Sequence, residues 1–298
     1  MTTNIPILRS TLPSSKKLKA ALLSVFEGGI LAEGDYVYEF EKKFSQMFNI
    51  KNVLAVSSGT AAIHMALLLA NIKNDDEVIT TSMTAEPTNT AILQAGAFPV
   101  FADICMHTGN IDPQSIEMSI TKKTKAIIVV HYAGYPAKIK EIMRIARKYK
   151  LIVIEDCAHA LGAMVEGKSV GTFGDFAIFS FQAVKHITTI DGGMLVMKNI
   201  KHISRAKKMR WFGLTKGKPR HLNRITELGY KYNMTNISAV IGILQLETFA
   251  RNLKKYIYNG NFLTNELNKG HLIKPASVSM NEFPSYWFFT GIAKNSTK

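Results

Sequence analysis

The chain alternates short β-branched strand patterns with helical patterns from about Asn52 to Gly193, and this alternation limits the fold more than any other feature. Strand patterns occupy residues 53–58, 77–81, 98–103, 125–131, 151–156, 176–181 and 192–197. Helical patterns occupy about 60–70, a stretch leading to residue 94, and 138–150. Strands that alternate with helices form a mostly parallel sheet covered on both faces. The sequence therefore predicts an α/β fold that binds ligands at the carboxyl ends of its strands.

The pattern changes after about Lys198, where basic helix-like segments and loops follow. A long helix is predicted from about Thr235 to Tyr256, and the tail contains a β-like segment, FPSYWFFTGIA, which ends abruptly. We expect a large domain over residues 1–250, with an N-terminal arm, and the start of a small, incomplete C-terminal domain over 251–298. An incomplete domain would expose apolar side chains, and we expect exposure of Trp287, Phe288 and Phe289.

Composition excludes several classes of protein. Of the 298 residues 47% are hydrophobic, which is too many for a disordered chain. The two cysteines, Cys105 and Cys157, cannot form a disulfide scaffold and lack a paired metal-ligand spacing, so a reduced, cytoplasmic protein is expected. No apolar run approaches the roughly 20 residues that span a bilayer, and the first residues lack a secretory pattern.

The formal net charge of +15 permits an anionic ligand. The densest basic cluster, Lys201 to Arg224, contains no recognised nucleic-acid motif. A solvated basic surface is the simpler interpretation, and neither a nucleic acid nor a membrane is predicted as a partner.

The first candidate site is SSGTAAIHMALLLA, residues 57–70. A predicted strand ends at Ser57-Ser58-Gly59-Thr60 and a helix begins at once. Exposed N–H groups and the positive end of the helix dipole at such a turn bind anions, and Gly59 allows close approach. The alternative is an ordinary serine or threonine helix cap.

The second candidate is VIEDCAHALGA, residues 153–163, where Glu155 and Asp156 close a very apolar strand. A buried carboxylate there is costly unless a cation meets it. The alternatives are an N-cap for Asp156 and a packed or capping role for His159. Asp156, Cys157 and His159 are too close together for a tetrahedral site, and no metal is predicted.

The third candidate is Lys185, in GDFAIFSFQAVKHITTIDGG, residues 174–193. It follows the strand that contains Ser180 and is surrounded by small and apolar residues. Burial lowers the pKa of a lysine, and a neutral amine can form a Schiff base with a carbonyl. The alternative is a surface lysine in a loop.

Together the three candidates match what pyridoxal 5′-phosphate (PLP) requires. Its phosphate needs N–H donors, its ring nitrogen needs an anion, and its aldehyde needs a lysine. No single candidate is specific, but their combination on one sheet is.

At these residues the sequence resembles the PLP-dependent sugar-nucleotide aminotransferases of the DegT/StrS type, with the type I aminotransferase fold. The resemblance runs from about Gly28 to the C-terminal end and includes ILAEGDYVYEFEKKF, GNIDPQSIE, TKAIIVVHYAGYPA and LGYKYNMTNISAVIGILQL besides the candidates above. The segments VVHYAGYP and SFQAVKH are similar to the perosamine-synthase-like subgroup. The resemblance implies transfer of an amino group, from glutamate or another amino acid, to a nucleotide-diphosphate keto sugar in deoxyamino-sugar or surface-polysaccharide biosynthesis. It also implies a homodimer with shared active sites.

The resemblance also implies the role of each site residue. Lys185 would bind PLP covalently and move a proton between substrate and cofactor, and Asp156 would pair with the ring nitrogen. His159 would lie near the phenolic oxygen. The phosphate would be held by the turn and the following strand end, at Ser58, Gly59, Thr60 and Ser180. Lys231, in the segment GYKYNM, would complete the phosphate site of the second subunit.

Two departures from the family pattern leave alternatives open. Ala85 stands where an aromatic residue often covers the PLP ring, and Glu86 adds a carboxylate beside it. A related sugar dehydratase would carry histidine in place of Lys185, so transamination is favoured. A truncated homologue without catalytic activity is the other alternative.

Overall fold

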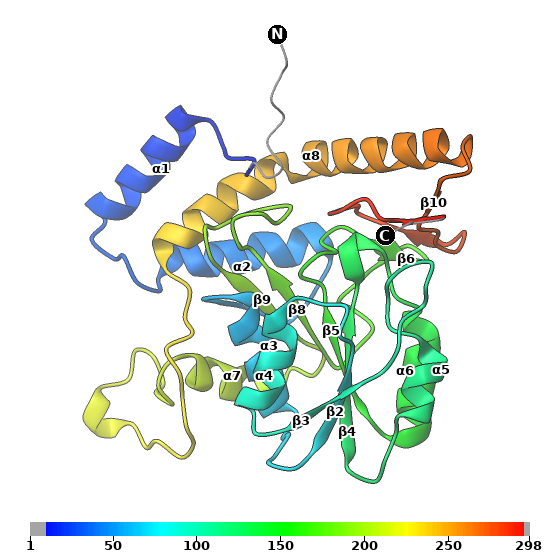
Figure 1. Cartoon of the computed structure of the whole chain (residues 1–298). Coiled ribbons are helices and arrows are strands. Elements are labelled where there is room, and N and C mark those ends of the chain that lie inside the picture. The colour runs from blue at the N-terminus through cyan, green and yellow to red at the C-terminus, as the bar shows by residue number, and fades with distance from the viewer. Residues whose placement is uncertain (1–9, 295–298) are drawn as a thin grey trace.

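The computed structural model describes residues 10–294. The first nine residues of the expected N-terminal arm, where a secretory pattern would begin, lie outside the described residues. Its centre is a seven-stranded sheet in the order β1-β9-β8-β5-β4-β2-β3 (Figure 1). The strands are β1 (Val53–Val56), β2 (Glu77–Thr80), β3 (Phe98–Phe101), β4 (Thr124–Val130), β5 (Ile152–Asp156), β8 (Phe176–Ser180) and β9 (Gly193–Met197).

The sheet is mostly parallel, as predicted. Strands β3, β2, β4, β5 and β8 run parallel to one another, whereas β9 is antiparallel to both β8 and β1. The carboxyl ends of β5 and β8 therefore lie at the same edge, and this edge carries Asp156 and Ser180.

Helices cover both faces of the sheet (Figure 1). One face packs against α2 (Asp35–Phe48), α6 (Ile139–Tyr149) and α8 (Asn236–Asn268); the other packs against α3 (Gly59–Leu69), α4 (Glu86–Gln94) and α7 (His202–Arg210). Along β4, Ile127 and Val129 face the first layer and Ile128 faces the second. Burial on both faces explains why these strands read as continuous apolar runs.

The remaining elements lie around this core. Helix α1 (Ser15–Glu27) packs on α8, and α5 (Pro113–Met118) lies beside α6. The short elements are η1 (Tyr132–Gly134), β6 (Met164–Val165), β7 (Lys168–Ser169), η2 (Arg220–Leu222), β10 (Ile273–Pro275), β11 (Glu282–Phe283) and β12 (Gly291–Ala293).

Three predictions after residue 198 need correction. Helix α8 continues past Tyr256 to Asn268, across the expected domain boundary. In the segment FPSYWFFTGIA only its ends are strands, in β11 and β12. Trp287 is half-buried rather than exposed, because it packs against His159, and Phe289 is also half-buried; Phe288 is 44% exposed, as expected.

Candidate active site

A cavity of about 360 Å³ opens at the carboxyl ends of β5 and β8. Its walls come from six places in the sequence: the start of α3, the start of α4, the end of β4, the end of β5, the stretch from β8 to Lys185, and residues 191–192. The lining includes seven of the eight residues selected from the sequence: Ser58, Gly59, Thr60, Asp156, His159, Ser180 and Lys185. Ser58 and Lys185, which are more than 120 residues apart in the sequence, therefore line the same cavity.

The start of α3 forms one wall of this cavity. The Ser58 hydroxyl accepts a hydrogen bond from Ala61 N at 3.0 Å and caps the helix, so the capping role is real. A Cβ atom on Gly59 would lie 3.0 Å from Ser180 Cβ, so glycine allows the helix start to approach the end of β8. This approach places the Thr60 and Ser180 side chains beside the same N-terminal N–H groups, which favour an anion.

Asp156 ends β5 and is 3% exposed. Its Oδ2 accepts a hydrogen bond from the Thr88 hydroxyl at 2.8 Å, and its Oδ1 accepts one from Ala158 N at 3.0 Å. Burial raises the pKa of this carboxyl, while both hydrogen bonds and the charge of Lys185 act in the opposite direction. The carboxylate is therefore held in one orientation at the cavity wall.

Lys185 lies in the loop after β8 and lines the same cavity. Burial lowers the pKa of its amine from 10.5 to about 8, and the charge of Asp156 acts against this change. Lys185 is half-buried at the cavity wall, which argues against the alternative of a surface lysine. A substantial neutral fraction makes this amine a nucleophile near neutral pH.

His159 contributes a neutral ring. Its Nδ1 accepts a hydrogen bond from Ala133 N at 3.4 Å, which leaves the ring proton on Nε2. Burial lowers its pKa to about 3, with a further contribution from the charge of Lys185. The ring stacks on Trp287, with centroids 3.9 Å apart and planes at 25°.

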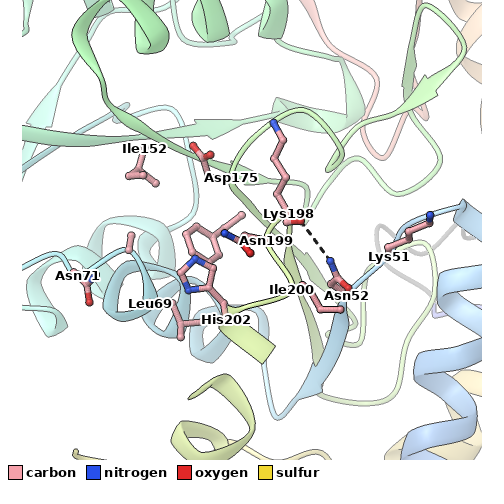
Figure 2. Close-up of a pocket in the computed structure, with 12 residues that line it drawn as sticks. Lys51, Asn52, Leu69, Asn71, Ile152, Asp175, Lys198, Asn199, Ile200 and His202 are labelled. Atoms are coloured by element: carbon pink, nitrogen blue, oxygen red, sulfur yellow. Dashed lines mark hydrogen bonds between the residues drawn. The ribbon is translucent and has the colours of Figure 1, made fainter. Parts of the chain in front are cut away.

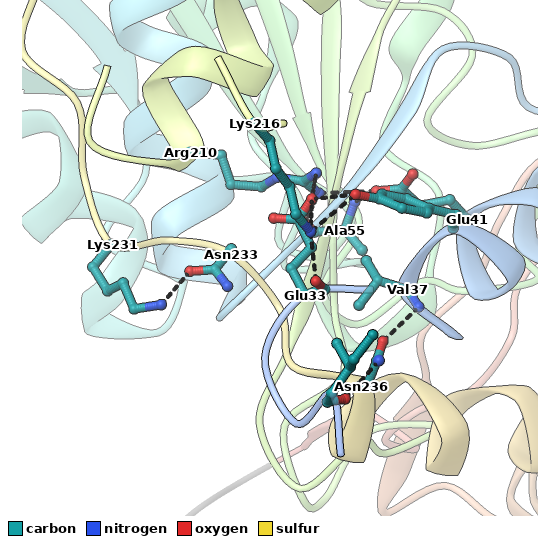
Figure 3. Close-up of polar contacts among 11 residues, drawn as sticks. Glu33, Val37, Glu41, Ala55, Arg210, Lys216, Lys231, Asn233 and Asn236 are labelled. Carbon is teal, nitrogen blue, oxygen red and sulfur yellow. Dashed lines mark hydrogen bonds and ion pairs between the residues drawn. The ribbon is translucent and has the colours of Figure 1, made fainter. Parts of the chain in front are cut away.

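Lys231 does not line this cavity. Its Nζ donates to Asn233 Oδ1 at 2.8 Å and lies 4.1 Å from the centre of the Trp211 ring (Figure 3). Within one chain it therefore lies outside its own site, which is compatible with the role toward a second subunit that the resemblance implies.

A buried ion-pair network, formed by Arg210 with Glu33 and Glu41, lies near Lys231 (Figure 3). Arg210, 2% exposed, bonds Glu33 at 2.8 Å and Glu41 at 2.9 Å, and it donates to Ala55 O in β1. Lys216 adds a hydrogen bond to the Glu33 carbonyl oxygen. The network connects α7 and the basic loop after it with β1, whose end leads into the anion-binding turn.

Two residues of the site were missed from the sequence. Thr88 reaches Asp156 from the first turn of α4, and no spacing along the chain signals that contact. Trp287 comes from the C-terminal segment that was expected to be exposed. Ala85 and Glu86 both line the cavity, so the absence of an aromatic side chain at position 85 is a feature of the site itself.

The residues present fit PLP. The helix start supplies N–H donors and hydroxyls for a phosphate, Asp156 supplies a buried anion with both oxygens oriented, and Lys185 supplies an amine of lowered pKa. All three groups line one cavity.

A second cluster near the site, His131, Glu155 and Cys157, has ligand atoms within 4.8 Å of one another. Its carboxylate already accepts hydrogen bonds from His131 Nε2 and from three backbone N–H groups, at residues 171, 173 and 174. His131 Nδ1 accepts a further bond from Ala137 N. These hydrogen bonds stabilise the buried carboxylate of Glu155 without a cation and give Glu155 a structural role.

A larger cavity, of about 820 Å³, lies at the amino ends of β5 and β8 (Figure 2). Three of its polar side chains are engaged within the chain: Asp175 accepts from Val153 N, Lys198 donates to Phe173 O, and Asn52 donates to Lys198 O. Ligands of parallel sheets bind at the opposite edge, so size does not identify the site here.

Comparisons with known proteins agree with this geometry. The model of the DegT/DnrJ/EryC1/StrS aminotransferase family matches residues 14–298. An uncharacterized protein, MJ1066, of Methanocaldococcus jannaschii is 45% identical over 221 residues, which is 72% of this chain and 57% of that protein. The GDP-perosamine synthase of Escherichia coli O157:H7 is 36% identical over 267 residues, which is 90% of this chain and 72% of that protein.

Among solved structures, AtS13 from Actinomadura melliaura superposes with a TM-score of 0.94 at 32% identity. The match covers 98% of this chain and 80% of AtS13. Among residues 10–294, no helix combines the length and the apolar character that crossing a membrane requires.

Proposed function

Because the chain belongs to the DegT/DnrJ/EryC1/StrS aminotransferase family, whose cofactor is PLP, we propose that it transfers an amino group from an amino acid to a nucleotide-linked keto sugar. The observation that carries the proposal is the position of the Lys185 amine. It lines the same cavity as Asp156 and the start of α3. There the phosphate, the ring nitrogen and the aldehyde of PLP would each have a partner.

When bound, PLP supplies an aldehyde that takes up the amino group and a conjugated ring that withdraws electrons. The residues of this chain supply orientation and proton transfer. The neutral amine of Lys185 would act as the nucleophile and as the base that takes a proton from one carbon, and its protonated form would deliver that proton to the other, so that the proton moves between substrate and cofactor. Asp156, oriented by hydrogen bonds from Thr88 and from Ala158 N, would place a negative charge beside the ring nitrogen.

His159 has a different role, because it stays neutral at all ordinary pH values. Its Nε2–H can donate a hydrogen bond to an oxygen without adding a positive charge beside Lys185. Such a donor suits the phenolic oxygen of the cofactor.

The proposed acceptor is a sugar attached to a nucleoside diphosphate, and the proposed donor is glutamate. The 36% sequence identity to a GDP-perosamine synthase supports this class of acceptor, and a net charge of +15 suits a diphosphate. The product would be a deoxyamino sugar for a surface polysaccharide.

We further propose a homodimer that shares its active sites. Lys231 does not line its own cavity. It follows a basic loop, residues 212–229, that projects from the body of the chain (Figure 1). Large apolar side chains of α1 and of this loop are exposed: Leu23, Phe26, Ile225 and Leu228. A second copy would cover them and would receive Lys231 at its phosphate site.

The test is the absorbance spectrum of the purified protein with PLP, before and after addition of glutamate. We expect glutamate to convert the aldehyde form of the cofactor to the amine form, and addition of a nucleotide-linked keto sugar to restore the aldehyde form with an aminated product. Lys185→Ala should abolish both conversions while the circular dichroism spectrum stays unchanged.

Two other outcomes would overturn the proposal in different ways. A deoxygenated sugar as product would identify a dehydratase. Failure of borohydride to fix PLP at Lys185, together with no cofactor absorbance, would identify a homologue without catalytic activity.

A further inference from the structure

The segment from β11 to β12 is bound to two loops of the active site. Ser285 N donates to Gly134 O at 2.9 Å and Phe288 N donates to Ala133 O at 3.1 Å. On the other side, His186 Nε2 donates to Ser285 O at 3.0 Å. The segment thus joins the loop after β4 to the loop that carries Lys185.

Trp287 lies at the centre of this connection. Its Nε1 donates to Val184 O at 2.9 Å, one residue before the lysine. The Lys185 Nζ atom lies 3.8 Å from the centre of the indole, and the His159 ring stacks on it at 3.9 Å. One side chain therefore contacts two of the three titratable groups that the cofactor would meet, Lys185 and His159.

The backbone around Trp287 is built for this approach. Gly134 has φ of +93°, and a Cβ atom there would lie 2.8 Å from Trp287 N. At Gly260 in α8, a Cβ atom would lie 2.3 Å from the ring of Tyr286. Gly134 and Gly260 thus allow the segment around Trp287 to pack closely against the loop after β4 and against α8. These two contacts fix the position of Trp287.

We propose that Trp287 is a positioning residue of the active site, whose indole holds the Lys185 amine and the His159 ring in place beside the cofactor cavity. The indole face attracts an ammonium group, most strongly where water is excluded. The lysine is free of the cofactor before PLP binds and again when the cofactor carries the amino group, and in those states the indole keeps the amine at the cavity. The inference rests on the proposed role of Lys185, but its test does not require transamination.

The test measures the pKa of Lys185 in the cofactor-free protein. Acetic anhydride labels neutral amines, and mass spectrometry gives the extent of labelling at Lys185 across about pH 6 to 10. The charged or titratable groups that act on this amine are Asp156, His159 and His186. Both histidines have lowered pKa values, about 3 and about 4, and stay neutral over this range.

Removal of the indole face should destabilise the ammonium form. We expect Trp287→Leu to lower the labelling pKa of Lys185 by about 0.5 to 1 unit, and Trp287→Phe, which keeps an aromatic face, to lower it less. The matched control is Trp211→Leu, because Trp211 contacts Lys231 in the same way outside the cavity. This control should leave the labelling of Lys185 unchanged.

A pKa of Lys185 that stays constant or rises in Trp287→Leu would overturn the inference, because Trp287 would then only fill space or exclude water. An equal effect of the leucine and phenylalanine variants would overturn it as well. If transamination fails while these shifts are found, the proposed function is wrong and the positioning role remains.

Discussion

Capture of PLP by the cofactor-free protein should follow the titration of Lys185. With a pKa of about 8 rather than 10.5, roughly a quarter of the amine is neutral at about pH 7.5, against about one part in a thousand for an ordinary lysine. The reactive form is therefore ~200-fold more abundant. Burial is the cause, because the enclosed ammonium has lost water.

The rate is measured by stopped-flow absorbance after mixing the cofactor-free protein with PLP over a range of pH. We expect the rate to rise with pH and to level off above the pKa of about 8. N-acetyl-lysine in the same buffers serves as a control, since it reports the titration of PLP itself. Lys185→Met should show no covalent capture.

The Asp156→Asn variant tests the electrostatic part of the argument. The charge of Asp156 raises the pKa of Lys185, so its removal should move the inflection to lower pH. An inflection near 10.5, or one that Asp156→Asn leaves in place, would refute the conclusion that burial and this carboxylate set the reactivity of the amine.

Two further predictions concern the residues that support the site. Thr88→Val removes a hydrogen bond to the Asp156 carboxylate, so the pKa of that carboxyl should rise further, the acid limb of the pH–rate profile should move to higher pH, and kcat should fall about tenfold. Arg210→Met leaves Glu41 without its positive partner and Glu33 with only Lys216, 3.5 Å away, and should lower the free energy of unfolding in urea by about 3–5 kcal/mol, whereas Arg205→Met, which breaks a partly exposed pair, should cost about 1 kcal/mol or less. The cost of Arg210→Met should shrink as the pH is lowered, because burial already raises the pKa of Glu41 and protonation removes its charge. Equal costs for the two arginine variants would contradict this account.

The central sheet and most of the site could be predicted from the sequence. Parallel strands buried on both faces leave a continuous apolar run, and the polar residues that follow such runs lie at one edge of the sheet. Asp156 and Ser180 are placed by this rule alone. The apolar neighbours of Lys185 indicate burial, which lowers the pKa of an amine, but they leave a surface lysine as the alternative. The combination of the three candidates and the family resemblance favour the cavity.

The C-terminal segment could not be predicted in the same way. Its aromatic residues have high β propensity, but the backbone of Ser285 and Phe288 bonds to the loop after β4 instead of forming a ladder. Gly260 lies within α8 without ending it, because the helix packs there against Tyr286. Both outcomes depend on contacts between distant segments, which local propensity does not contain.

Burial shifts the protonation of the titratable groups around the cavity in one common direction. Burial lowers the pKa values of Lys185, His159 and His186 and raises that of Asp156, so each group is displaced toward its neutral form. The charges of Lys185 and Asp156 each favour the charged form of the other group. Without its partner, either group would be neutral over a wider range of pH. An anionic cofactor would add negative charge to this cavity and raise the pKa of any nearby ammonium. The N–H groups at the start of α3 belong to the lining of this cavity, so a phosphate held there can be neutralised by the helix end while the amine stays reactive.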